Sequence, residues 1–286
     1  LGFPAGQVQL MARSMSAPSG AVIVAGPTGA GKSATLASCL QLVHENRKVF
    51  TIEDPVKRLV NHATQVPVSG DGHDVASMSD AVMGMDPDVM VLSQVDDEKT
   101  ARVMARAALT GHLVISTLHT NTAMGIISRL LDMGLGMHLV SDPCFLHTLV
   151  CQHLLPKVCP RCAVPVTHSK RHHEGTFRWQ KVFGGHFESI QVRKDGGCEH
   201  CCGTGIQGRS VIAEIIWIDE AGRDYIRKQA WAAWEAHLRE HGWESYRDRA
   251  LKLIRCGLVD PIDAEKVVGE IRMSHRIDHF QYFDYN

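Results

Sequence analysis

The residues whose chemistry is easiest to define form one contiguous loop near the start of the sequence. Gly26-Pro27-Thr28-Gly29-Ala30-Gly31-Lys32-Ser33 matches G-x-x-x-x-G-K-[ST] in full, between an apolar run and a helix-like segment. Such a loop turns backbone N–H groups toward phosphates, while its lysine adds a cation and its serine a hydroxyl for Mg²⁺. We therefore predict a site for ATP or ADP with Mg²⁺; the alternative is a glycine-rich turn without a ligand. The predicted binding residues are Gly26, Pro27, Thr28, Gly29, Ala30, Gly31, Lys32, Ser33 and Thr35.

Cysteines supply a second chemical pattern. Two C-x-x-C pairs, Cys159/Cys162 and Cys198/Cys201, are separated by residues 163–197. Four thiolates suit a tetrahedral Zn²⁺ and leave no open position for catalysis, so the predicted zinc site is structural. Free buried thiols or a disulfide pair are the alternatives, and the adjacent Cys202 could compete as a ligand. The remaining thiols are expected to be small core residues, namely Cys39, Cys144, Cys151 and Cys256.

Composition and charge narrow the class of protein. The chain has 286 residues, a net charge of −1 and an odd number of cysteines, nine. An odd count argues against a secreted disulfide framework and favours a reducing compartment, the cytoplasm. The near-neutral charge gives no general attraction to nucleic acid or to an anionic membrane. Apolar stretches are too short to span a bilayer, and no secretory signal opens the sequence. Because the first residue is Leu1 and not Met, we expect a fragment of a longer protein.

The elements that must position these residues alternate in the first half of the chain. Apolar runs at 21–25, 49–52, 89–92 and 113–116 predict buried strands, and apolar periodicity predicts helices at 33–44 and about 97–109. A polar loop is expected at 69–74, and two further helices before Cys159. The composition from 159 to 208 is rich in cysteine, histidine and glycine. Helices are expected from about 219, with Trp231, Trp234 and Trp243 in the core. This alternation predicts an α/β fold with a mainly parallel sheet.

Several later segments, in order, resemble the family of type II secretion and type IV pilus assembly ATPases. These segments are 51–56 (an acidic box), 86–91 (the entry to a Walker B strand), 108–113 with 116–121 (a histidine box), 128–134 and 204–209. The resemblance covers roughly residues 1–270. It implies a RecA-like P-loop domain at 1–156, a tetracysteine zinc subdomain at 157–210 and a helical region at 211–286. It also implies assembly or secretion rather than pilus retraction, because the tetracysteine motif belongs to assembly motors.

The resemblance assigns roles to two residues that follow strand ends. Glu53 is implied to orient and deprotonate the attacking water, and it stands where the phosphate loop of a parallel sheet would also lie. His119 is implied to sense or stabilise the γ-phosphate. The alternatives are a solvated acidic turn before Pro55 and a hydrogen-bonded structural histidine.

The sequence departs from the family after the third strand. Where the family has Gly-Glu-Ile-Arg-Asp, this chain has Ser93-Gln94-Val95-Asp96-Asp97. Gln94 therefore replaces a carboxylate expected near Mg²⁺, and Asp96 replaces an arginine. Asp80 and Gly84 stand where the preceding helix of the family carries arginines. The N-terminal domain of the family, which supplies further arginines, is not recognised here. Gln94 is kept as a reaction-centre residue, with slower hydrolysis expected.

Three functions remain open at this point. The first is a hexameric, Mg²⁺-dependent ATPase that drives pilin or pseudopilin assembly through an inner-membrane platform protein. Such a motor would be cytoplasmic and peripheral at the inner membrane. The second is a nucleotide-binding ring subunit with weak or no hydrolysis. The third is a conjugation or DNA-transport ATPase, which the zinc motif and neutral charge disfavour, so no direct nucleic-acid contact is expected. A segment containing Lys170, Arg171, His172, His173 and Arg178 is predicted to be a solvated basic loop or a contact for a membrane partner.

Overall fold

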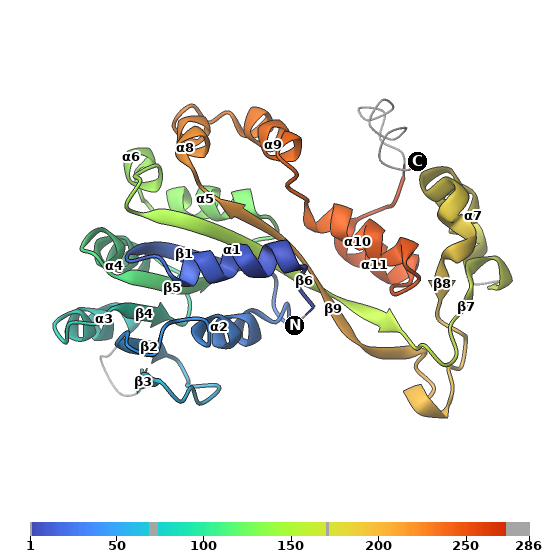
Figure 1. Ribbon diagram of the computed structural model, residues 1–286, viewed down its shortest axis with the longest axis horizontal. Coiled ribbons are helices and arrows are strands. Elements are labelled where there is room, and N and C mark those ends of the chain that lie inside the picture. Colours follow the sequence, from blue (N-terminus) through green and yellow to red (C-terminus); the bar gives the residue numbers. More distant parts are fainter. Residues whose placement is uncertain (1, 69–73, 170–171, 273–286) are drawn as a thin grey trace. The chain divides into compact units, whose positions relative to one another are not determined.

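The computed structural model describes residues 2–68, 74–169 and 172–272, and it divides into two compact units (Figure 1). Residues 3–152 and 213–243 form what we call the phosphate-loop unit. Residues 153–212 and 244 onward, with Gly2, form the cysteine unit. Two of the passages between units lie within long strands, β6 (Leu146–Val158) and β9 (Ile206–Trp217). The region expected at 157–210 thus lies within the cysteine unit, whereas the expected helical region 211–286 is shared by both.

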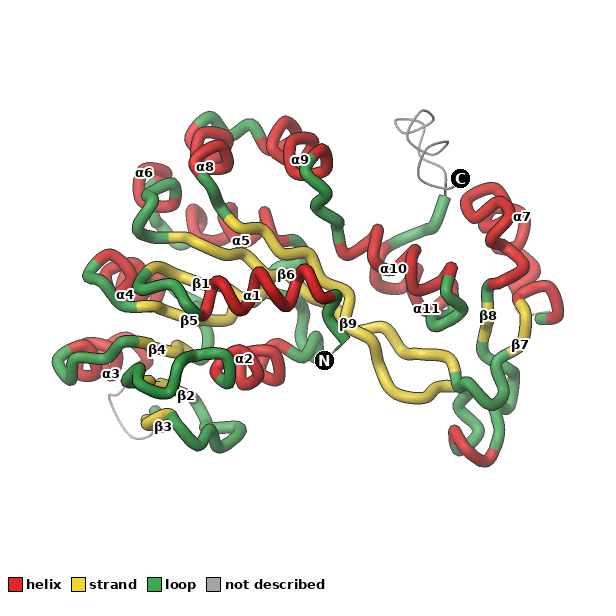
Figure 2. Tube along the Cα trace, in the orientation of Figure 1, coloured by secondary structure: helices red, strands yellow, loops and turns green. Residues whose placement is uncertain are grey.

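A seven-stranded sheet organises the phosphate-loop unit, with the strand order β3-β2-β4-β5-β1-β6-β9 (Figure 2). The five strands that complete it are β1 (Gly20–Ala25), β2 (Val49–Glu53), β3 (Ala63–Pro67), β4 (Val89–Leu92) and β5 (Leu113–Leu118). Neighbours from β3 through β6 pair in parallel. Because both faces of a parallel sheet are covered, its central strands are apolar throughout, as the fully buried β1 and β5 are. The predicted α/β fold with a mainly parallel sheet is confirmed.

The helices of the phosphate-loop unit each bury at least one residue against its apolar cores. They are α1 (Ala5–Met15), α2 (Lys32–Leu40), α3 (Val75–Met83), α4 (Glu98–Leu109), α5 (Ala123–Asp132), α6 (Met137–Val140), α8 (Glu220–Arg227) and α9 (Trp231–Glu240). Asp97 caps α4 by accepting a hydrogen bond from the Thr100 N–H. The helix therefore begins at Glu98, one residue after its predicted start. The helix after the phosphate loop ends at Leu40, not at His44, because Leu42 and Val43 turn back onto Cys39 and Leu40.

The cysteine unit has its own apolar core. It contains α7 (His173–Phe183), α10 (Tyr246–Arg255) and α11 (Pro261–Val268), together with a small antiparallel pair, β7 (Val164–Pro165) and β8 (Gln191–Val192). Trp179 and Phe183 of α7 are buried in the same cluster as Leu253 of α10. His172, which is fully buried, donates or shares a proton across 2.9 Å with Asp260, the residue that caps α11. This buried pair connects the start of α7 to the start of α11.

Several smaller predictions have outcomes in these units. Cys39 and Cys151 are buried as expected, but Cys144 and Cys256 are exposed, because they lie in a turn and at a helix end. Trp234 is buried, and Trp231 and Trp243 pack partly buried against the same core. Of the predicted loop 69–74, only Asp74 belongs to the described residues, where it caps α3. Lys170 and Arg171 lie outside the described residues. None of the described helices combines the length and apolar character that crossing a bilayer requires.

Candidate functional site

The chemically active candidates of the phosphate-loop unit follow the carboxyl ends of neighbouring parallel strands. The phosphate loop follows β1, Glu53 ends β2, Gln94 follows β4 and His119 follows β5. The carboxyl ends of parallel strands meet at one edge of a sheet, which is where ligands bind in open α/β folds. The parallel register therefore gathers residues that are up to 93 positions apart, from Gly26 to His119, at a single edge.

Glycine gives the phosphate loop its shape. Gly26 has φ of +148°, and a Cβ there would lie 2.3 Å from the backbone oxygen of Gln152, so no other residue fits without displacing β6. Gly29 and Gly31 also have positive φ, and Gly31 precedes the first residue of α2. The Gln152 side chain, on β6, donates a 2.7 Å hydrogen bond to the Ala30 oxygen and so attaches the loop to that strand. Gln152 was not anticipated from the sequence, because β6 itself was not.

Lys32 and His119 are brought together by the fold. The Lys32 ammonium donates to the Gly26 and Pro27 oxygens at 2.8 and 3.1 Å, and its Nζ lies 3.2 Å from His119 Nδ1. Burial lowers the pKa of Lys32; Cys151 and Asp96 act in the opposite direction. These hydrogen bonds hold the Lys32 ammonium against the phosphate loop, where a bound phosphate would lie. Ser33 is exposed at the mouth of the same loop, whereas the Thr35 side chain is buried.

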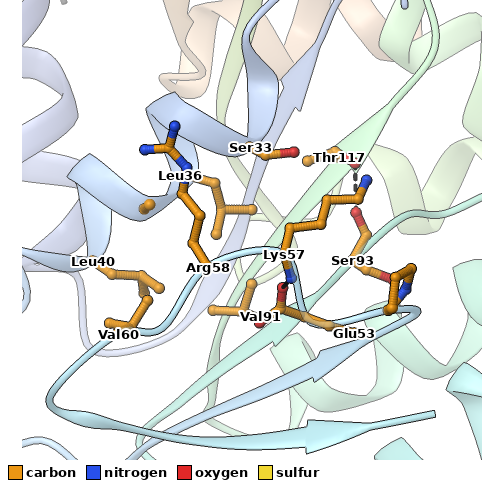
Figure 3. Close-up of a pocket in the computed structure, with 12 residues that line it drawn as sticks. Ser33, Leu36, Leu40, Glu53, Lys57, Arg58, Val60, Val91, Ser93 and Thr117 are labelled. Atoms are coloured by element: carbon orange, nitrogen blue, oxygen red, sulfur yellow. Dashed lines mark hydrogen bonds between the residues drawn. The ribbon is translucent and has the colours of Figure 1, made fainter. Parts of the chain in front are cut away.

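Glu53 is positioned by three donors. Its Oε1 accepts from Thr51 Oγ1 at 2.8 Å and from Gln65 Nε2 at 2.9 Å, and its Oε2 has only a weak 3.5 Å contact with the Lys57 N–H. Oε2 is thus the less engaged oxygen. Glu53 and Ser33 line one pocket, which is closed on another side by Ser93 and Thr117 (Figure 3). A carboxylate across a pocket from the phosphate loop has the placement that activation of a water requires.

Gln94 is engaged within its own turn. Its amide nitrogen donates to both carboxylate oxygens of Asp96 at 2.7 Å. The turn is held by backbone, because the Val95 N–H donates to the Thr117 oxygen and Thr117 Oγ1 donates to the Ser93 oxygen. Two of the residues that depart from the family pattern, Gln94 and Asp96, are therefore hydrogen-bonded to each other. Asp80, a further departure, pairs with Arg106 on the outside of α3 and α4.

The four predicted zinc ligands form one cluster in the cysteine unit. The sulfurs of Cys159, Cys162, Cys198 and Cys201 all lie within 4.8 Å of one another. Three of the separations are 3.9 Å (Cys159–Cys198), 3.8 Å (Cys162–Cys201) and 3.8 Å (Cys198–Cys201). Zn–S bonds of about 2.3 Å in a tetrahedron place sulfurs about 3.8 Å apart, so the donor set fits the metal.

The surroundings of this cluster act differently on two of its thiols, because burial raises the pKa of Cys162 to about 12 while Cys201 is shifted the other way. Cys201 Sγ accepts from the backbone N–H groups of Cys198 and Gly205, both at 3.2 Å, and these bonds lower the pKa of that thiol to about 6. A Cβ at Gly197 would lie 2.8 Å from the same sulfur, so glycine is needed there. Cys202 is exposed with φ of +51° and is not part of the cluster. The structure thus selects four of the five cysteines in this region.

Comparison with known sequences points to one family. The chain matches the family described as type II/IV secretion system protein over residues 1–272. It is 34% identical over 273 residues to the type II secretion system ATPase E of Vibrio cholerae, covering 94% of this chain and 52% of that protein. It is 35% identical over 228 residues to the type IV pilus assembly ATPase PilB of Thermus thermophilus, covering 79% of this chain and 25% of that protein.

Solved structures with a similar fold include the pilus retraction motor PilT with bound ADP. The TM-score is 0.67 at 25% identity, covering 94% of this chain and 66% of that one. The ATPase DotB of Legionella pneumophila has a TM-score of 0.65 at 18% identity, over 93% of this chain and 63% of that one, which is a similarity of fold alone. The chain spans about half the length of the type II secretion relatives that it matches.

Proposed function

Because the chain belongs to the type II/IV secretion system protein family, we propose that it is the ATP-hydrolysing motor part of a type II secretion or type IV pilus assembly machine. The observation that carries this proposal is the meeting of Lys32 with His119 at the phosphate loop, with Glu53 across the adjoining pocket. These residues come from three different strand ends. A glycine-rich turn without a ligand would give no reason for the three to converge.

Each residue has a role that its surroundings support. Backbone N–H groups of the loop and the start of α2 receive the phosphates, and Lys32 contacts the outer ones. Ser33, whose hydroxyl forms no hydrogen bond within the described residues, is a ligand for Mg²⁺, which neutralises phosphate charge when bound. Glu53 orients water and takes its proton at the less engaged Oε2, while His119 lies against the terminal phosphate. Gly26, Gly29 and Gly31 give the loop its conformation, and Thr35 stabilises α2 from within the fold.

The proposed assembly, location and partners of the chain rest on its similarity to secretion and pilus assembly ATPases. The chain acts in a homo-hexameric ring, completed by a domain of the longer protein, and it transmits ATP turnover to pilin or pseudopilin assembly. It works in the cytoplasm at the inner membrane, against a platform protein in that membrane. The cysteine cluster holds a structural Zn²⁺, since all four donors belong to the protein and none is left for a substrate.

A second candidate is a ring subunit that binds ATP and hydrolyses it weakly or not at all. The contact between Gln94 and Asp96 favours it, because the amide at 94 cannot balance metal charge and is engaged by a neighbouring carboxylate. The two candidates differ in rate rather than in site.

Phosphate release from Mg²⁺–ATP tests the proposal, with any natural segments that flank the chain retained. We expect measurable turnover that Lys32→Ala abolishes, and that Glu53→Gln lowers by about 10²–10³ without loss of ATP binding. Binding that depends on Lys32 without any turnover would favour the second candidate. Turnover unchanged by Lys32→Ala would contradict both candidates.

A further inference from the structure

Two cations of the phosphate-loop unit have no electrostatic partner in the described part of the chain. Lys57 and Arg58 follow the acidic turn after β2, and neither side chain forms an ion pair or hydrogen bond there. Some other exposed cations of this unit are paired, as Lys99 is with Asp74 and Arg102 with Glu98. Isolated exposed lysines are common, so the lack of a partner alone assigns no role.

The two side chains take different directions in the pocket that contains Ser33 and Glu53. Both residues line that pocket. In Figure 3 the Lys57 side chain extends across it toward Thr117, whereas the Arg58 guanidinium is directed to the other side, next to Leu36. The backbone of Lys57 is held near the proposed reaction centre by its N–H contact with Glu53 Oε2. Lys57 thus begins at the residue proposed to hold the water and ends on the phosphate-loop side.

The positive charge of Lys57 acts on Lys32 of the phosphate loop. Burial is the main cause that lowers the pKa of Lys32, and the positive charge of Lys57 lowers it further. Two like charges that act on each other are both stabilised when an anion lies between them. In the proposed function the loop binds the inner phosphates through its backbone, and Lys57 lines the pocket that also contains Ser33, the last residue of the loop. The group best placed to meet both cations is the outermost phosphate.

We propose that Lys57 is a specificity residue that contacts the terminal phosphate of ATP and thereby makes the site prefer ATP to ADP. The inference rests on the proposed function, because it assumes that the phosphate loop binds a nucleotide. Lys57 supplies from this chain a positive charge at the γ-phosphate, in a site where Asp96 stands in place of an arginine. Arg58, one residue further along and directed away, makes no such contact.

The test compares affinities for ADP and for a non-hydrolysable ATP analogue, both with Mg²⁺, by calorimetric titration. Loss of one charge-assisted contact should lower the ratio of ATP-analogue to ADP affinity about tenfold in Lys57→Ala, with ADP affinity unchanged. Lys57→Arg should retain the ratio. Arg58→Ala is the matched control, of equal charge and in the same loop, and should also retain it.

The outcomes separate this inference from the function on which it rests. A ratio unchanged in Lys57→Ala, in protein whose binding still requires Lys32, overturns the inference and leaves the proposed function standing. An equal fall in Lys57→Ala and Arg58→Ala also overturns it, because a general field and not a contact would then be responsible. Failure of the unaltered protein to bind either nucleotide overturns the proposed function, and the inference with it.

Discussion

The phosphate loop and the cysteine cluster are both shaped by glycines with positive φ, but their polar groups are arranged in opposite ways. At the loop, Ser33 is exposed, Lys32 is held on carbonyls, and Glu53 keeps one oxygen nearly unengaged across a pocket. In the cluster, the four sulfurs face one another, and Cys201 Sγ accepts two backbone N–H bonds. The first arrangement leaves room for a ligand from outside the protein, and the second has room for one ion only.

This difference indicates how each site is coupled to folding. The loop is built on β1 and α2, and Gly26 and Gln152 hold its shape through contacts within the protein. The cluster joins two knuckles from distant parts of the sequence, and its own apolar contacts are few. A structural metal at such a cluster contributes its binding free energy to folding. Loss of the nucleotide should therefore leave the phosphate loop folded, whereas loss of the metal should unfold the region around the cysteine cluster.

The largest expected effect is the loss of zinc. We expect one Zn²⁺ per chain by elemental analysis of protein purified under reducing conditions. Structural zinc contributes on the order of 10 kcal/mol, so Cys201→Ser should remove hydrogen-exchange protection around residues 159–205 and spare the phosphate loop. Cys202→Ser is the control, because Cys202 is exposed and lies outside the cluster. Protein without stoichiometric metal, or equal effects of the two substitutions, would rule out the zinc site.

A smaller effect is expected at the buried pair of His172 and Asp260. Asp260 accepts from His172 and from the N–H groups of Arg193 and Ile262, so Asp260→Asn should destabilise the cysteine unit by about 1–3 kcal/mol at neutral pH. Although burial alone would raise the pKa of Asp260, these hydrogen bonds lower it below 3.8. The stabilisation is therefore complete above the ordinary carboxyl pKa and is lost as the pH falls from there through the lowered pKa of folded Asp260.

Urea unfolding followed by hydrogen exchange measures this effect. The difference between the unaltered protein and Asp260→Asn should shrink below pH 3.8, while the exposed Asp195→Asn should show no difference at any pH. A difference that persists unchanged into acid would mean that the carboxylate charge is not what stabilises the pair.

The smallest effect is expected at Gln94, the residue near the phosphate loop that replaces a carboxylate of the family pattern. Gln94→Glu restores a carboxylate near Mg²⁺ and should raise turnover about tenfold or more at unchanged ATP affinity. Because the new carboxylate would face Asp96, the gain should be larger when Asp96 is replaced by asparagine as well. Asp96→Asn alone is the control and should leave turnover unchanged. No gain in either Gln94→Glu variant would place residue 94 outside the reaction centre.

The contiguous and periodic parts of the molecule could be predicted from the sequence. Four strands, the phosphate loop and the four clustered cysteines follow from motifs and from apolar runs that a parallel sheet requires. The strands β6 and β9 were missed because their buried positions include Thr148, Gln152 and His153 in β6 and Glu214 in β9. Glu214 is satisfied by the N–H of Ala123 at the start of α5, a contact that only the fold creates. The edge strand β3 was missed because it buries little.

Side-chain pairings in the site could not be predicted either, because they depend on contacts that only the fold creates. The sequence indicated that Lys32, Glu53 and His119 lie at one edge, but not that Gln65 holds Glu53 or that Gln94 binds Asp96. Gln65 belongs to β3, and Gln94 departs from the family pattern. In both cases the partner is chosen by strand register and turn geometry, which local residue types do not encode.

The most direct test of the central claim, that the phosphate loop is a nucleotide site that forms independently of the cysteine cluster, is calorimetric titration of the chain with Mg²⁺–ATP. The account predicts binding at one site per chain, nearly equal affinity in Cys201→Ser, and loss of binding in Lys32→Ala. Binding that survives Lys32→Ala, or that disappears in Cys201→Ser, would contradict it.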